Sequence, residues 1–137
     1  MDRWAIASWE PHARSALRVV AAFTFSLHGF QKLWGLFGGM GGQGATASFP
    51  SLFWTAGALE AFGGTLLLVG LFTRPVAFFL AGEMAFAYFK AHLPRSPWPI
   101  QNGGELAVLY CFVFLWLTTA GPGPWSLDQI IRRRPLR

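Results

Sequence analysis

Four long apolar segments dominate the sequence and leave little else from which a fold can be built. They cover about residues 14–37, 53–73, 75–92 and 101–120, and each ends beside glycine, proline or charged residues. A helix needs roughly 20 residues to cross about 30 Å of hydrocarbon, and all four segments come near that length. The sequence therefore predicts an all-α fold, a polytopic membrane protein built as a bundle of four transmembrane helices.

Composition agrees with this prediction. The 137 residues suit a single domain, and 53% of them are hydrophobic while only 12% are charged. Soluble domains carry about 25% charged residues, so the alternative of buried helices in a soluble protein is disfavoured. The N-terminus carries Asp2, Arg3 and Glu10 rather than a basic start and an apolar run. We therefore expect no cleaved signal peptide.

Most of the basic residues lie on one side of the predicted bundle. If four helices alternate across the membrane, the other side holds only Lys32, Lys90 and Arg95 of the 11 basic residues. This asymmetry follows the positive-inside rule, so both termini are predicted to be cytoplasmic. The C-terminal arginines are interpreted as an orientation signal and a contact for anionic lipids, and nucleic-acid binding is not expected. The cytoplasmic set is Arg3, Arg14, Arg18, Arg74, Arg132, Arg133, Arg134 and Arg137.

The chain divides into three parts on this interpretation. Residues 1–13 form an N-terminal cytoplasmic or interfacial segment, residues 14–120 the four-helix membrane domain, and residues 121–137 a basic cytoplasmic tail. Prolines and glycines end the fourth helix. Ser126 or Asp128 is then suited to cap a short final helical turn.

Polar and ionisable side chains interrupt the apolar segments, and a bilayer tolerates them poorly. A charge at the bilayer centre costs roughly 2.5 to 3.5 kcal/mol, so such groups usually face the bundle interior and find partners. His28, Gln31 and Lys32 share one side of the first helix, and Glu60 is expected at the same depth in the second. The predicted intramembrane polar pocket comprises His28, Gln31, Lys32, Glu60, Glu83, His92, Asn102 and Glu105.

These residues allow a functional pocket or a network of ion pairs that only fixes the helix register. Lys32 can also extend to the outer interface, and Asn102 with Glu105 suits a helix cap. No catalytic residue is assigned.

No metal site is predicted either. The Glu-x-x-His spacing of di-metal bundles is absent, and the single cysteine, Cys111, cannot form a thiolate cluster. Haem held between His28 and His92 is a minor alternative.

Short motifs around these residues follow one another along most of the chain. They occupy residues 28–33, 60–64 with 70–75, 83–87 with His92, 102–105, and 121–123 with 126–128. In order and spacing they resemble the DoxX family of small bacterial membrane proteins. The resemblance implies a multi-pass protein of the bacterial inner membrane. Relatives include the membrane subunit of a thiosulfate:quinone oxidoreductase and partners of redox-defence enzymes.

Three functional hypotheses follow. In the first, the chain is a subunit of a redox complex and contributes a quinone-binding or proton-relay pocket. It has no intrinsic cofactor, is not catalytic alone, and receives electrons from a partner subunit. His28 or His92 would then donate a hydrogen bond to a quinone oxygen. The aromatic residues expected to hold the ring are Phe30, Trp34, Phe86 and Tyr88.

In the second hypothesis the chain is a non-catalytic accessory subunit that stabilises a larger respiratory or photosynthetic membrane complex. In the third it binds a small apolar ligand or a lipid in a cavity between short helices. The expected partners are the lipid bilayer and other membrane or redox subunits, or further copies of the chain in a homo-oligomer.

Overall fold

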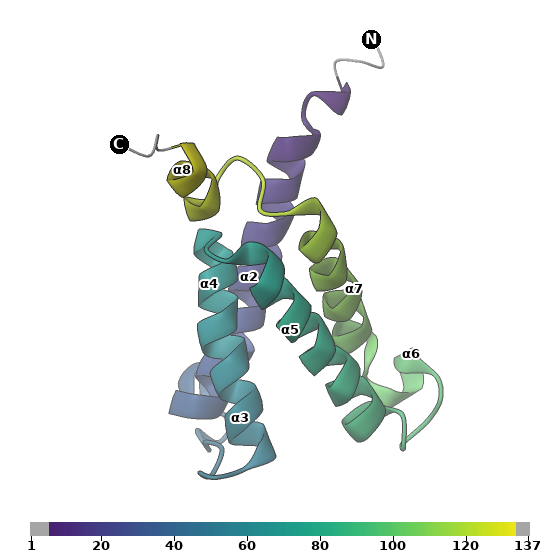
Figure 1. The fold of residues 1–137 in the computed structure, drawn as a ribbon. Helices are drawn as coiled ribbons and strands as arrows, with labels where there is room; N and C mark the ends of the chain where they lie inside the picture. The colour runs from purple at the N-terminus through teal and green to yellow at the C-terminus, as the bar shows by residue number, and fades with distance from the viewer. Residues whose placement is uncertain (1–5, 134–137) are drawn as a thin grey trace.

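The computed structural model describes residues 6–133, and every regular element in that range is helical (Figure 1). The all-α prediction is therefore confirmed. Asp2, Arg3, Arg134 and Arg137, which entered the sequence argument, lie outside the described residues. The elements are α2 (Glu10–Trp34), η1 (Leu36–Gly38), α3 (Leu52–Ala58), η2 (Leu59–Gly63), α4 (Gly64–Val69), α5 (Thr73–Ala87), η3 (Tyr88–His92), α6 (Pro99–Asn102), α7 (Glu105–Ala120) and α8 (Leu127–Arg133).

The long helices form two pairs. Helix α2 packs along the continuous run of α3, η2 and α4, and α5 packs along α7. The two pairs lie close together at the end that carries α8 and diverge toward the opposite end (Figure 1). We call these the joined end and the open end of the molecule.

Local sequence signals explain where the helices begin and end. Pro11 stands in the first turn of α2, where its missing N–H costs no hydrogen bond, and Gly35 ends the helix with a left-handed φ of 67°. The Ser51 hydroxyl accepts a hydrogen bond from the Trp54 N–H at 3.1 Å and caps α3. Gly70, with φ of 70°, ends α4.

Small residues let the first pair pack backbone against backbone. A Cβ atom on Gly29 would lie 2.2 Å from the backbone nitrogen of Ala61, and one on Gly64 would lie 2.9 Å from the Cβ of Ser26. Such close approach is the usual role of small residues between membrane helices. Because the two helices touch here, the side chains that flank Gly29 are held at a fixed position relative to the second helix.

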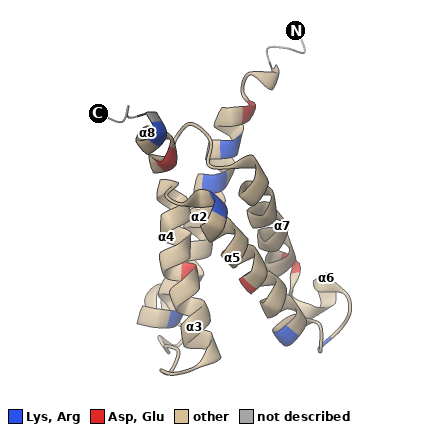
Figure 2. Cartoon of the chain, in the orientation of Figure 1, with Lys and Arg blue, Asp and Glu red and all other residues tan. Residues whose placement is uncertain are grey.

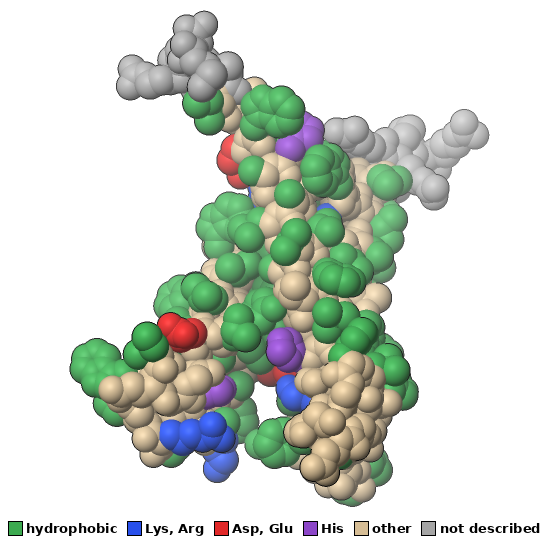
Figure 3. Space-filling model, turned by 180° about the vertical axis from the view of Figure 1, so that it is seen from behind, with side chains coloured by type: hydrophobic (Ala, Val, Ile, Leu, Met, Phe, Trp, Pro, Cys, Tyr) green, Lys and Arg blue, Asp and Glu red, His purple; other side chains and the backbone are tan. Residues whose placement is uncertain are grey.

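The apolar core lies between the pairs toward the joined end. Phe25 and Phe114 are buried and meet edge to face, with ring centroids 4.9 Å apart, and Leu67, Leu80 and Leu117 are buried with them. Large apolar side chains also cover the outside (Figure 3). Phe79, for example, is 70% exposed. An apolar exterior suits a protein surrounded by lipid.

The helices differ in how well they suit a membrane span. Within the described residues, the run Leu52–Val69 is long and apolar enough to cross a membrane, with a mean hydropathy of 1.5 over 18 residues. Helix α7 has 16 residues, because Gly103 and Gly104 separate it from α6 where the sequence predicted one helix from residue 101. Helix α2 begins at Glu10, so the predicted boundary between residues 13 and 14 falls inside it.

Basic residues of α2, α5 and α8 gather at the joined end (Figure 2), and one of them is completely buried. The guanidinium of Arg18 donates to the carbonyl oxygens of Pro122 at 2.9 Å and Leu68 at 2.7 Å. It also donates to the carbonyl oxygens of Leu67 and Trp125. Arg18 thus ties the end of α4 to the segment after α7, a role that its interpretation as an orientation charge did not include.

Two further arginines bind the last carbonyl groups of α7. Arg74 donates to the Thr118 carbonyl at 2.8 Å and to that of Thr119, and Arg14 donates to the Ala120 carbonyl. A cation at a helix C-terminus satisfies free carbonyl groups and complements the helix dipole. These side chains therefore hold the joined end together.

Candidate functional site

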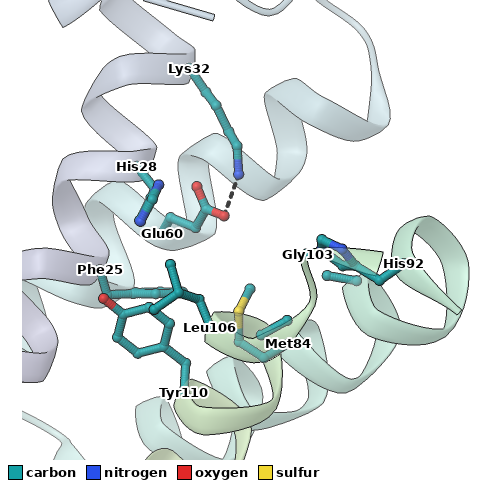
Figure 4. A pocket seen from close by; sticks show the side chains of 11 residues that line it. Phe25, His28, Lys32, Glu60, Met84, His92, Gly103, Leu106 and Tyr110 are labelled. Carbon is teal, nitrogen blue, oxygen red and sulfur yellow. Dashed lines mark hydrogen bonds and ion pairs between the residues drawn. The ribbon is translucent and has the colours of Figure 1, made fainter. Parts of the chain in front are cut away.

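A cavity of about 270 Å³ lies where the two helix pairs diverge. Figure 3 shows the hollow from behind, with His and basic side chains at its rim, and Figure 4 shows its wall. Both helix pairs contribute, so the cavity exists only because the two pairs are splayed. Its lining residues are Phe25, His28, Lys32, Glu60, Met84, Ala87, His92, Gly103, Leu106, Ala107 and Tyr110.

An ion pair between Lys32 and Glu60 stands at the wall formed by the first helix pair (Figure 4). The Lys32 ammonium donates to one carboxylate oxygen of Glu60, and the side chains are 22% and 5% exposed. The other Glu60 oxygen is buried and has no hydrogen-bond partner among residues 6–133. The contact agrees with the depth that the sequence predicted for these two residues.

Each helix pair has a π-helical segment beside the cavity. Glu60 belongs to η2 and His92 to η3, and each segment is five residues long. Such π turns are rare and occur frequently at functional sites, because the widened turn rotates a side chain out of the regular α-helical register. Nothing in the sequence analysis predicted them.

The histidines reach the cavity from opposite sides. His28 of α2 is exposed and lies 6.5 Å from Tyr110 between ring centroids. His92 is held by its Nδ1 atom, which lies 3.0 Å from the Asn102 carbonyl oxygen. This contact fixes the orientation of the His92 ring.

Tyr110 is the polar cavity residue that the sequence analysis missed, beside apolar ones such as Phe25 and Leu106. Its hydroxyl donates to the Thr24 hydroxyl at 2.8 Å, which bridges α7 and α2 below the cavity. Its ring meets Phe25 at 5.1 Å between centroids. The Tyr110 hydroxyl is a polar group on a largely apolar helix, which could have marked it in the sequence. Only the packing of α7 near α2 shows that it faces the cavity.

Four of the predicted pocket residues do not line the cavity: Gln31, Glu83, Asn102 and Glu105. Asn102 is buried, and its side chain bonds the Ser96 carbonyl and the Gly104 N–H, both at 2.7 Å. It shapes the turn before α7 but does not cap that helix, whose N-terminus has no side-chain cap hydrogen bond. Glu105 is exposed at the start of α7, and Gln31 is half-buried on α2.

Glu83 differs from these three. Both of its carboxylate oxygens are buried, and neither has a hydrogen-bond partner among the described residues. Glu60 and Lys32 lie within electrostatic range of it. Its neighbour in the sequence, Met84, lines the cavity, whereas Glu83 itself does not.

The aromatic residues expected to hold a ring are not those on the wall. Phe30 and Trp34 contact each other, with centroids 5.7 Å apart, and Phe86 is 53% exposed. Tyr88 stacks on His92 at 6.3 Å without lining the cavity. The rotation of each helix about its axis, which the sequence does not specify, turns these rings away and turns Phe25 and Tyr110 in.

No three His, Cys, Asp or Glu side chains gather as a metal-binding group within residues 6–133. Cys111 is a free thiol, half-buried on α7. The polar chemistry of the cavity is thus that of an ammonium, a carboxylate, two imidazoles and a phenol.

An all-helical chain with an apolar exterior and an internal polar cavity has the character of a small helical membrane protein. Residues 13–93 match the DoxX family, and the chain belongs to that family. It is 41% identical over 124 residues to an uncharacterized protein of Haemophilus influenzae, a match that covers 88% of this chain and 92% of the relative. No solved structure matches the chain.

Proposed function

We propose that this DoxX protein is the membrane subunit of a redox complex and binds the ring of a quinone in the cavity between its helix pairs. The observation that carries the proposal is the Lys32–Glu60 ion pair at the wall of an otherwise largely apolar cavity. A volume of about 270 Å³ is close to the lower end of small-ligand sites, which begin at about 300 Å³, and suits a single ring.

The lining matches the two kinds of surface on a quinone. The carbonyl oxygens of the ring need donors, which the Lys32 ammonium and the His28 imidazole supply. The face of the ring needs apolar contacts, which Phe25 and Leu106 supply. Glu60 stands beside the donors and is the group that exchanges protons with the ligand. Electrons come from a partner subunit, since the proposal assigns no redox cofactor to this chain.

The proposed topology has four spans with both termini in the cytoplasm. At about 1.5 Å per residue the run Leu52–Val69 is about 27 Å long and α7 about 24 Å, while α2 with 25 residues is longer than the hydrocarbon core. The basic joined end faces the cytoplasm, and the cavity lies in the outer half of the bilayer.

Cysteine labelling tests this topology. The native cysteine is first replaced in Cys111→Ser, and single cysteines are then introduced as Gly42→Cys at the open end and Gln129→Cys at the joined end. A membrane-impermeant maleimide added to intact cells is expected to label the first and not the second. Labelling of Gln129→Cys alone would show that the orientation is the opposite of the proposed one.

Purification in mild detergent, followed by mass spectrometry of the proteins and lipids that accompany the chain, tests the function. We expect a stoichiometric quinone together with a redox subunit, and loss of the quinone in His28→Ala and Glu60→Gln. Leu109→Ala is the matched control, because Leu109 is 62% exposed on α7 and does not line the cavity. A large complex with no bound quinone would support the accessory-subunit alternative. A bound lipid in the cavity would support the third hypothesis.

A further inference from the structure

We propose that Glu60, Glu83 and Lys32 form a buried site that holds one exchangeable proton, and that the proton resides on Glu83. This site belongs to the resting protein and does not require a bound quinone. Glu83 lies in the second half of α5, and both of its carboxylate oxygens are buried without a hydrogen-bond partner among residues 6–133.

The neighbouring carboxylate is also incompletely satisfied. The Glu60 side chain is 5% exposed, and Lys32 binds one of its oxygens. The second oxygen is buried and unpartnered within the described residues. Two carboxyl groups therefore present three buried oxygen atoms that lack a donor within the described part of the chain, and one of these groups, Glu60, lines the cavity.

The charges around Glu83 do not balance unless a proton is present. Titratable side chains line the neighbouring cavity from several elements: Lys32 and His28 from α2, Glu60 from η2, His92 from η3 and Tyr110 from α7. Of these, Lys32 carries the fixed positive charge, and it is already paired with Glu60. An unpaired carboxylate in an apolar interior is strongly disfavoured, and two carboxyl groups that share one cation retain one proton.

The cavity gives this proton a route. Glu60 lines the cavity, whereas Glu83 does not. A proton that enters from the cavity thus meets Glu60 before Glu83. Its uptake by two ionised carboxylates raises the total charge of the three side chains from minus one to zero. Its transfer from Glu60 to Glu83 then leaves that total at zero, with one positive charge, one negative charge and one neutral acid.

Dicyclohexylcarbodiimide tests the proposal, because this lipid-soluble reagent modifies carboxyl groups that are protonated in apolar surroundings. We expect peptide mass spectrometry of the treated protein, near neutral pH, to find the adduct on Glu83. Labelling should fall as the pH is raised and should be absent in Glu83→Gln. Glu105 is the internal control: it is exposed and should remain unmodified.

Two variants test the charge balance itself. In Glu60→Gln, Glu83 is the remaining carboxyl group near Lys32, so Glu83 should ionise. Its labelling by the carbodiimide should then fall by about tenfold or more, which corresponds to a shift of about one unit in the pH at which Glu83 is labelled. In Lys32→Met no cation remains, and a second adduct should appear on Glu60. A purely structural role for the cluster predicts neither change.

Infrared spectroscopy gives an independent measurement that does not depend on reagent access. The carbonyl band of a protonated carboxylic acid should be present in the wild type and should decrease in Glu83→Gln. Equal bands in the two proteins, with no adduct on Glu83, would overturn the proposal. Suppression of labelling by sodium but not by choline would overturn it in favour of a bound metal cation. If the wild-type protein carries no quinone but Glu83 is still labelled, the proposed function is refuted and the proton site is not.

Discussion

The carboxylate of Asp128 accepts a hydrogen bond from the backbone N–H of Thr73 at 2.9 Å, across 55 residues of chain. Its other oxygen accepts from the Phe72 N–H at 2.8 Å. Asp128 therefore caps α5 from the C-terminal segment, whereas the Ser126 hydroxyl accepts from the Gln129 N–H at 3.2 Å and caps α8. The sequence predicted that one of these residues caps the final turn; the prediction is correct for Ser126, while Asp128 caps a different helix.

Replacing Asp128 with alanine should destabilise the joined end. Loss of an N-terminal helix cap costs about 1 kcal/mol, within a range of roughly 0.5 to 2 kcal/mol. Thermal unfolding of the purified protein in detergent measures the difference. Asp128→Asn is the matched control: it keeps one acceptor oxygen and should lose less. Equal losses in the two variants would show that charge, rather than capping, carries the effect.

The same residue gives the fold a dependence on acid pH. Burial of Asp128 tends to raise the pKa of its carboxyl group, but the N–H groups of Thr73 and Phe72 and the charge of Arg132 outweigh burial and hold the pKa below its ordinary value. The stabilisation is thus complete above the unfolded pKa of about 3.9 and is lost as pH falls through the lower folded pKa. The stability difference between wild type and Asp128→Ala should therefore shrink in acid. A difference that stays constant would contradict this linkage.

Arg18→Met should be among the most destabilising single substitutions in the chain. It removes the donor that Arg18 supplies to the carbonyl groups of Pro122 and Leu68, and each unsatisfied buried group costs about 1 to 3 kcal/mol. We expect a loss of roughly 3 kcal/mol in the free energy of unfolding. Arg95→Met removes an exposed arginine at the open end and should change stability little. Similar losses in both variants would indicate a general effect of positive charge.

Gly29→Ala should separate the first helix pair. The added Cβ would lie 2.2 Å from the Ala61 nitrogen, so the backbones must move apart at a cost of about 1 to 3 kcal/mol. Gly82→Ala is the control, since a Cβ there meets nothing within 4 Å. Thermal unfolding compares the two variants. A stable Gly29→Ala protein would refute the close packing of α2 on η2.

Leu106→Trp should fill the cavity and displace the proposed ring without unfolding the protein. Leu106 lines the cavity and is 56% exposed, so the larger side chain has room. Leu109→Trp lies outside the cavity wall on the same helix and serves as the control. Bound quinone, measured by mass spectrometry after purification, should be lost only in Leu106→Trp. Retention in both variants would place the quinone elsewhere.

The sequence predicted much of the local structure. The apolar segments predicted the helices, although the first two end at Gly35 and Gly70, before the predicted bounds at residues 37 and 73. The sequence placed Lys32 and Glu60 near enough in depth to meet, and the long Lys32 side chain spans the remaining offset between the two helices. These features depend on length, periodicity and neighbouring residues, which a sequence states directly.

Tertiary structure decided the rest. The splay of the two helix pairs creates the cavity, and the rotation of α7 turns Tyr110 toward it. Contacts between residues far apart in the chain bury Arg18 against the end of α4 and leave Glu83 without a donor. Periodicity shows which residues share a face of a helix, but it does not show which neighbour that face meets. That choice depends on how all the side chains pack at once.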